Sequence, residues 1–301
     1  SGDNNDRVWS PCKRINHTQM AKAKDSDRLA ELVAEAESKK IDELKKTNER
    51  LLKQIDKLKD KKAELVQAVC KGAYDGINSL TLPTLKPPSK PKSKKKSEEI
   101  CVPLLSDIQL AKITPNYSTE VAEKRVEEYA HKIVKLADLQ SSSASVRKCV
   151  VLALGDIVEG ELIFPGQSFL IDASLYSQVT VDGPRILYKF FATVLERFDE
   201  VDVHWVIGNH GALGGRSRRD YDPETNADRM LGKILETMFA SEKRIKFIIP
   251  AGKHDRNWYS VADLGDKAKF LCFHGDQIRG HAGIPWYGYN KKILGWKSLA
   301  A

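Results

Sequence analysis

Four short polar segments carry the side chains that could do chemistry in this chain of 301 residues. They are residues 107–109, 155–160, 208–211 and 273–276. Each directly follows an apolar run, and such runs of about four to eight residues rich in β-branched and aromatic side chains are typical of buried strands. The runs are residues 100–105, 149–154, 201–207 and 269–273. We therefore expect the polar segments to converge at one edge of a sheet.

The side chains in these segments are those that bind divalent cations. Asp107, Asp156, Asn209 and His274 offer carboxylate, amide and imidazole ligands, which suit manganese, iron or zinc. Two such cations, roughly 3.5–4 Å apart, can clamp a phosphate, activate a water and stabilise the leaving oxygen. The residue types therefore predict a two-metal site that cleaves phosphoesters.

The order of the segments resembles the calcineurin-like metallophosphoesterase superfamily, and in particular its nuclease-type branch. That family carries DxH, GDxxxG, GNH followed by an acid, a lone His, and a final GHxH, and the chain has four of these five blocks from about residue 100 onward. The resemblance implies an α/β fold, a layered αββα metallophosphoesterase sandwich. It also implies two divalent metal ions as cofactors, with Mn²⁺ expected first and Fe, Zn or Mg as alternatives.

The resemblance also implies a role for each matching residue. Asp156 would bridge both metals, while His210 would face the scissile phosphate to stabilise charge or to protonate the leaving group. Asp107 and Gln109 would bind the first metal, and Asn209 and His274 the second. Three further residues follow the GNH turn and could bind substrate phosphate, because the guanidinium fork suits that ligand. They are Arg216, Arg218 and Arg219.

Two departures from the family pattern affect the site. Gln109 stands where the family has a histidine, and an amide oxygen is a weaker ligand than imidazole for a transition metal, so the first metal should be held less tightly. Gly211 replaces the acid that normally orients the His210 ring. Asp220 or Asp222 from the following loop could take its place.

The final GHxH block is incomplete. His281 begins it, but Gly283 occupies the place of the second histidine, only nine positions after His274. Because so short a connection leaves little room for a turn and a new strand, we interpret His281 as a loop histidine, with a metal ligand as the alternative. The simplest interpretation is a C-terminally truncated or split form of a longer protein.

Basic charge is concentrated in the first third of the chain. Residues 1–100 hold 23 Lys and Arg against 16 Asp and Glu, whereas residues 101–301 hold 26 against 25. Residues 81–99 form a basic Pro/Lys-rich linker whose composition cannot build a core. This linker is either a tether for a polyanion such as nucleic acid or a soluble hinge, and the sequence does not separate the two.

A heptad pattern precedes the linker and predicts a coiled-coil helix over residues 25–80. Leucine recurs every seven residues, and one Asn interrupts the other seam position, a pattern typical of a parallel two-stranded coiled coil. The leucines are Leu44, Leu51, Leu58 and Leu65, and the Asn is Asn48. We therefore expect a homodimer through residues 41–69. The alternative is packing on the chain's own domain or on an acidic partner, and residues 1–24 are interpreted as disordered or as a remnant segment.

The remaining residues, 100–301, are predicted to form the metallophosphoesterase domain. Helices are expected over residues 119–139, 184–198 and 226–239, and their alternation with the strands indicates an α/β layered domain. No membrane span or secretory leader is readable, which predicts a cytoplasmic protein without a membrane partner. The five cysteines form no CxxC pair and are expected to be reduced packing residues.

Three functions fit these observations. The first is a metal-dependent hydrolase that cuts phosphodiester bonds, specifically a DNA nuclease. The second is a weak or inactive phosphoesterase that serves as a dimeric scaffold binding DNA or protein. The third is a small-molecule phosphodiesterase or phosphatase. Fold analogy does not separate them, since one fold hosts many functions.

Overall fold

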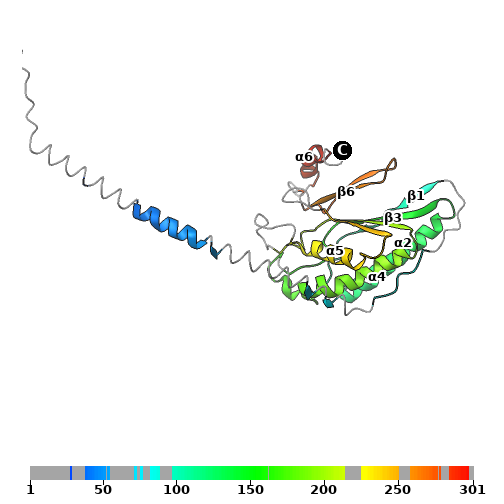
Figure 1. Ribbon diagram of the computed structural model, residues 1–301, viewed down its shortest axis with the longest axis horizontal. Helices are drawn as coiled ribbons and strands as arrows, with labels where there is room; N and C mark the ends of the chain where they lie inside the picture. Colours follow the sequence, from blue (N-terminus) through cyan, green and yellow to red (C-terminus); the bar gives the residue numbers. More distant parts are fainter. Residues whose placement is uncertain are drawn as a thin grey trace, which may run out of the picture. The chain divides into compact units, whose positions relative to one another are not determined.

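The computed structural model describes residues 28, 38–51, 53–54, 71–72, 75–76, 82–88, 97–161, 163–213, 225–250, 258–276, 278 and 285–297 (Figure 1). The chain divides into two compact units, Ser1–Leu65 and Val66–Ala301.

The first unit contains a helical stretch, residues 38–51. Its large apolar side chains are exposed, with Ile41 at 51%, Leu44 at 61% and Leu51 at 48%. Residues 38–51 are helical, but the structure does not support the predicted coiled-coil helix over residues 25–80. Most other residues of the predicted coiled coil lie outside the described residues, so pairing of two helices stays a prediction.

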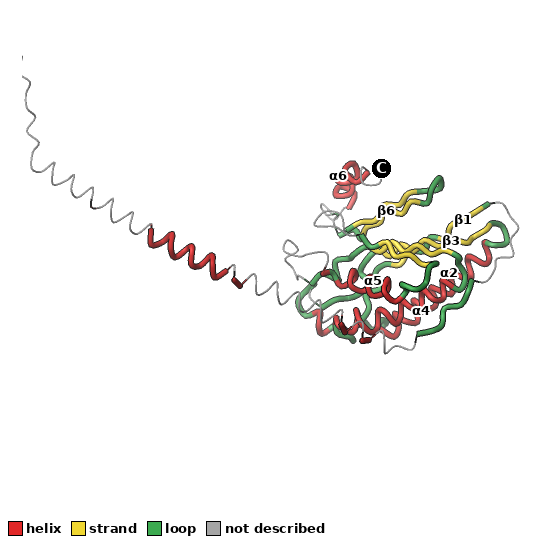
Figure 2. Tube along the Cα trace, in the orientation of Figure 1, coloured by secondary structure: helices red, strands yellow, loops and turns green. Residues whose placement is uncertain are grey.

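The second unit is built on a parallel sheet. Strands β1 (Glu98–Cys101), β3 (Ser145–Ala153), β4 (Glu200–Trp205) and β5 (Ile245–Ile248) lie in that order, and β2 (Leu104–Leu105) pairs with β3 (Figure 2). All these pairings are parallel, so the carboxyl ends of β2, β3 and β4 lie at one edge. This is the edge at which open α/β sheets bind ligands.

The predicted strand over residues 100–105 is present in two pieces. Pro103 lies between β1 and β2 and has no N–H to donate to a ladder. Its carbonyl still accepts the Leu152 N–H at 2.9 Å. The second piece therefore continues along β3 and delivers Asp107 to the sheet edge.

Three long helices cover one face of the parallel sheet. They are α2 (Thr119–Gln140), α4 (Gly183–Leu195) and α5 (Ala227–Met238), and they confirm the three predicted helices to within a few residues. Edge-to-face aromatic contacts from Phe191 to Phe239 and Phe247 join α4, the end of α5 and β5. The short elements η1 (Gln167–Phe169), α3 (Leu175–Ser177) and η2 (Gln178–Asp182) precede α4.

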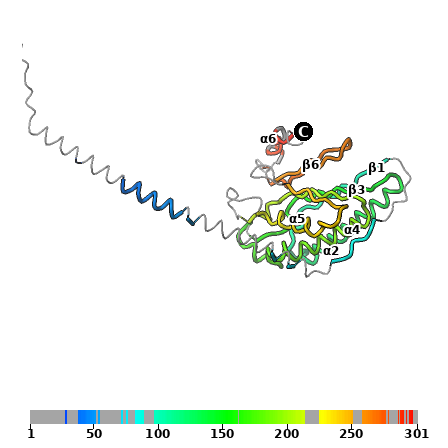
Figure 3. The backbone as a smooth tube through the Cα atoms, in the orientation of Figure 1, coloured from blue at the N-terminus to red at the C-terminus, as the bar shows by residue number. Residues whose placement is uncertain are grey.

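A β-hairpin packs on the other face of the parallel sheet (Figure 3). Its strands are β6 (Tyr259–Asp263) and β7 (Lys269–Phe273). Buried Ala262 and Cys272 of the hairpin pack against residues of β3 and its neighbours, including Val150 and Leu152. The described residues therefore form a mixed α/β unit whose parallel sheet lies between helices and a second, antiparallel sheet.

The hairpin also contacts β4 and α6 (Pro285–Lys297). His204 Nδ1 of β4 lies 2.8 Å from Ser260 Oγ of β6, and burial lowers the pKa of His204. On the outer side, α6 places Trp296 against Trp258 and Phe273, with ring centroids 5.3 and 4.7 Å away. The hairpin thus contacts both the parallel sheet and α6.

Part of the predicted linker contacts this unit. Leu82 and Leu85 are partly buried against the main core, and Lys86 lies 3.0 Å from the carboxylate of Glu196. Residues 82–88 are therefore less solvated than their composition suggests, while residues 89–96 lie outside the described residues.

The structure also shows the state of the cysteines and the apolar character of the helices. Cys101, Cys149 and Cys272 are free thiols in strands, as predicted, while Cys12 and Cys70 lie outside the described residues. Within the described part of the chain, no helix has both the length and the apolar character needed to cross a bilayer.

Candidate metal centre

The loops that follow β2 and β3 run side by side at the carboxyl edge of the sheet. The N–H of Asp107 donates to Gly155 O at 3.1 Å, and the N–H of Gln109 donates to Asp156 O at 2.9 Å. Asp107, Gln109 and Asp156 have φ of 52°, 48° and 51°. This left-handed backbone is costly for residues with a side chain and clusters at functional sites. Ala111, with φ of 78°, shares this backbone, and the other three are residues that the sequence had singled out.

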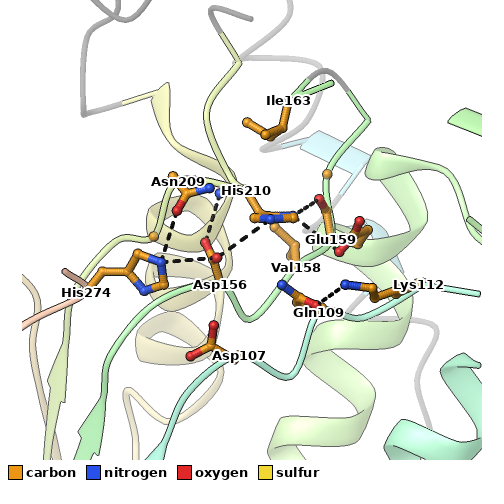
Figure 4. Close-up of polar contacts among 12 residues, drawn as sticks. Asp107, Gln109, Lys112, Asp156, Val158, Glu159, Ile163, Asn209, His210 and His274 are labelled. Carbon is orange, nitrogen blue, oxygen red and sulfur yellow. Dashed lines mark hydrogen bonds and ion pairs between the residues drawn. The ribbon is translucent and has the colours of Figure 1, made fainter. Parts of the chain in front are cut away.

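Asp156 lies at the centre of the site, with 3% of its surface exposed (Figure 4). Its Oδ1 accepts the backbone N–H of His210 at 2.8 Å, and its Oδ2 lies 3.1 Å from His274 Nε2. Burial raises the pKa of Asp156, but the hydrogen bonds from His274 and His210, with the charges of both rings, hold the pKa below its ordinary value. Asp156 is therefore an ionised carboxylate at neutral pH. Gly208 permits this arrangement, because a Cβ there would lie 2.1 Å from Asp156 Oδ1.

His274 comes from the second sheet, directly after β7. Its Nδ1 lies 2.9 Å from Leu154 O, which fixes the ring and leaves Nε2 3.1 Å from both Asn209 Oδ1 and Asp156 Oδ2 (Figure 4). Burial lowers the pKa of His274, but the hydrogen bond and charge of Asp156 outweigh it and raise the pKa to about 9. The ring thus faces two oxygens that are themselves candidate ligands.

One group of side chains has the spacing of a metal site among the described residues. Ligand atoms of Asp107, Asp156 and His274 all lie within 4.8 Å of one another. The Asn209 oxygen adjoins the group through His274. Two carboxylates, one amide oxygen and one imidazole suit manganese, iron or zinc, so the donor set fits the ion that the sequence predicts.

Binding of a divalent ion to this group should depend on pH through His274. A folded-state pKa of about 9, against an ordinary 6.5, means that the imidazolium stabilises the metal-free fold below about pH 6.5, and this stabilisation is lost as the pH rises through 9. Only the neutral imidazole binds a metal, so metal binding releases the proton of His274. The affinity for the metal should therefore rise with pH, by up to about tenfold per pH unit from about pH 6.5 to 8.5. Calorimetric Mn²⁺ titrations would measure this, and an equal slope in His274→Asn would contradict it.

Gln109 lies beside the site but gives its oxygen to another residue. Lys112 Nζ donates to Gln109 Oε1 at 2.6 Å (Figure 4). An amide oxygen bound in this way competes poorly for a cation. Gln109 therefore stands near the predicted first metal position with its oxygen already accepting one hydrogen bond from Lys112.

The acid beside His210 is one that the sequence did not suggest. His210 Nδ1 lies 2.9 Å from Glu159 O and 3.2 Å from Glu159 Oε2, so its Nε2 faces Asp156 Oδ2 at 3.9 Å (Figure 4). The carboxylate of Glu159 raises the pKa of His210. Glu159 itself is 1% exposed, and a buried acid needs a partner. A second acid beside Asp156 in the same glycine-bounded loop was the available signal.

The position after His210 takes glycine for a steric reason. A Cβ on Gly211 would lie 2.4 Å from Asn226 Oδ1 and 2.9 Å from Asp228 N. Asn226 caps α5 by accepting the Asp228 N–H and also donates to Gly208 O at 2.9 Å. An acid at position 211, as the family pattern has it, would collide with this cap.

Asp228, in the first turn of α5, binds the backbone of two other loops. Its two oxygens accept the N–H groups of Asp156, Ile157, Val158 and Gly208 at 2.9–3.2 Å. Burial raises the pKa of Asp228 to about 6, although these hydrogen bonds oppose the rise. One buried carboxylate therefore holds the two loops that carry Asp156 and Asn209.

Several predicted site residues lie outside the described residues. They are the phosphate-binding candidates Arg216, Arg218 and Arg219, the acids Asp220 and Asp222, and the loop histidine His281. No known family model matches the chain, and no curated protein matches it significantly. The interpretation of this site therefore depends on its geometry and its residue types.

Proposed function

We propose that this chain is a metal-dependent phosphoesterase that hydrolyses phosphodiester bonds, with DNA as its substrate. One observation carries the proposal: Asp107, Asp156 and His274 meet within 4.8 Å at the carboxyl edge of a parallel sheet. Three side chains separated by up to 167 positions have no need to meet there for the sake of packing. Their residue types suit a divalent cation rather than a buried core.

A divalent ion would be held by Asp107, Asp156 and His274. The Asn209 oxygen could complete the coordination shell of this ion or bind a second ion. Bound divalent cations supply Lewis-acid stabilisation of phosphate charge and acidify a water. Asp156 keeps its charge because the two histidines hold its pKa low. It can therefore serve as the central ligand across the physiological pH range.

His210 is placed to handle the proton of the leaving oxygen. Glu159 binds Nδ1 and raises the pKa of the ring, so a proton on Nε2 is retained more readily near neutral pH. Nε2 faces the metal-binding carboxylate rather than bulk solvent. The imidazolium can donate from Nε2 to a phosphate oxygen or to the departing alkoxide.

Nucleic acid is the proposed substrate because a polyanion can bind the basic first third of the chain. The basic excess lies in residues 1–100, and neutralised phosphates release counterions on binding. Dimerisation through residues 41–69 belongs to the same proposal, supported by the exposed Ile41, Leu44 and Leu51. Sedimentation of the full chain as a monomer would contradict it.

A weak or inactive scaffold is the second candidate, and one observation favours it. Gln109 replaces the first-metal histidine of the family pattern, and its oxygen is bound to Lys112. A site with one firmly held ion would hydrolyse diesters slowly. Nucleic-acid binding without metal-dependent cleavage would support this second function.

The test is cleavage of labelled single- and double-stranded DNA by the full chain with Mn²⁺, beside hydrolysis of bis-p-nitrophenyl phosphate. A nuclease should cut DNA and lose activity on chelation. Hydrolysis of the small diester alone would indicate a small-molecule phosphodiesterase. Failure to cleave any diester with Mn²⁺, Fe²⁺, Zn²⁺ or Mg²⁺ would overturn the proposed enzymatic function.

A further inference from the structure

We infer that a cleft between the loop after β2 and helix α2 binds one nucleotide of a single nucleic-acid strand, next to the scissile phosphate. This inference rests on the proposed phosphoesterase function and states how the substrate of that enzyme is bound. The cleft has a volume of about 470 Å³. Its lining includes Asp107, Gln109, Lys112, Tyr117, Arg125 and Tyr129.

The cleft and the candidate metal centre share the residue Asp107. Asp107 lines the cleft and is also a member of the metal-binding group. A phosphate held at that group would therefore lie at the mouth of the cleft, and the adjoining nucleotide would extend into it. A monoester without such a nucleotide would leave the cleft unused.

The charges of the cleft suit a phosphate backbone. Lys112 and Arg125 are the cations of the lining, and Asp107, its one acid, is a candidate metal ligand. Arg125 is positioned by a cation–π contact, with its guanidinium carbon 5.3 Å from the Tyr117 ring centroid. Lys and Arg contacts to phosphates fix the register of a bound strand without reading its sequence.

The walls of the cleft suit a base and a sugar. The hydroxyls of Tyr117 and Tyr129 donate to Ile108 O and Leu104 O, so both rings are fixed in place. Buried Leu105, Ile108 and Val126 complete an apolar wall. Aromatic and apolar walls beside cations are the usual platform for single strands, because every base has a face that can stack.

The size of the cleft favours one unpaired nucleotide. Its volume falls within the range of roughly 300–1,000 Å³ that holds one small ligand. A paired base would bring its partner strand against α2. We therefore expect single-stranded substrate to bind better than duplex at this position.

The experiment compares Arg125→Ala with Lys124→Ala in the full chain. Both residues are exposed cations on α2, but Lys124 lies outside the cleft and is bound to Glu120 at 2.6 Å. Binding of a fluorescent single-stranded probe of about five nucleotides is measured by anisotropy without metal, and KM and kcat are measured with Mn²⁺ for the same probe and for bis-p-nitrophenyl phosphate. The short probe limits contacts with the basic N-terminal part.

Arg125→Ala should raise Kd and KM for the probe about five- to tenfold and reduce the salt slope of binding by about one. It should leave kcat/KM for the small diester unchanged, and Lys124→Ala should resemble the wild type in all assays. Wild-type probe binding by Arg125→Ala, or equal loss on both substrates, would overturn the cleft assignment. If the wild type cleaves neither substrate, the proposed function fails, and the anisotropy comparison still decides whether the cleft binds a strand.

Discussion

Asp156→Asn is expected to lower metal-dependent diester hydrolysis by about a thousandfold or more, equivalent to about 4 kcal/mol of transition-state stabilisation. Asparagine has the shape of aspartate and can still accept the His210 N–H through one oxygen. It removes the negative charge that lies 3.1 Å from His274 and within the metal-binding group. The loss should therefore come from weaker metal binding rather than from misfolding.

Three measurements on Asp156→Asn separate these causes: kcat/KM with Mn²⁺, calorimetric metal affinity, and the midpoint of thermal unfolding. Asp266→Asn changes an exposed carboxylate in the β6–β7 turn and should leave all three near the wild type. Wild-type turnover by Asp156→Asn would rule out Asp156 as the central ligand. Activity that survives the double change Asp156→Ala and Asn209→Ala would rule out the whole site.

Asp228→Asn is expected to lower the free energy of unfolding by about 3–5 kcal/mol, a loss typical of breaking a buried charged contact. The carboxylate accepts four N–H groups from two loops, two at each oxygen, and the amide NH₂ that replaces one oxygen cannot accept its two. Buried donors left without an acceptor cost about 1–3 kcal/mol each. Metal affinity should fall as well, because the same hydrogen bonds position the backbone at Asp156.

Denaturant unfolding of Asp228→Asn would measure this loss. Glu120→Gln is the matched control, since Glu120 is also an acid in the first turn of a helix but is exposed. Its cost should stay within about 0.5 kcal/mol. An equally small cost for Asp228→Asn would show that the two loops hold their conformation without the carboxylate.

The position of the candidate site could be predicted from the sequence because it follows from strand polarity. Asp107, Asp156 and Asn209 each stand a few residues after a parallel strand, and parallel strands end at one edge. The three long helices were equally readable, since their lengths and apolar faces are typical of α/β domains. Strands β5 and β6 were not predicted, although both are short apolar runs.

The contacts that support the site could not be predicted in the same way. Glu159 reaches His210 across 51 positions, and Asp228 reaches Asp156 across 72, through loop conformations that no periodicity encodes. The hydrogen-bond partner of Gln109 could not be predicted from the sequence either. Its side chain could bind a metal or Lys112, and only the local geometry decides between them.

The two sheets contribute different candidate ligands, with Asp107 and Asp156 following strands of the parallel sheet and His274 following the hairpin. An ion held by all three would add to the contacts that already join the two layers, which are a small apolar cluster, the His204–Ser260 hydrogen bond and the hydrogen bonds of His274. Local opening of the hairpin would then require release of the ion. With such an ion bound, cation concentration and hairpin opening would be thermodynamically coupled, and scarcity of the metal would loosen this layer before the rest of the fold.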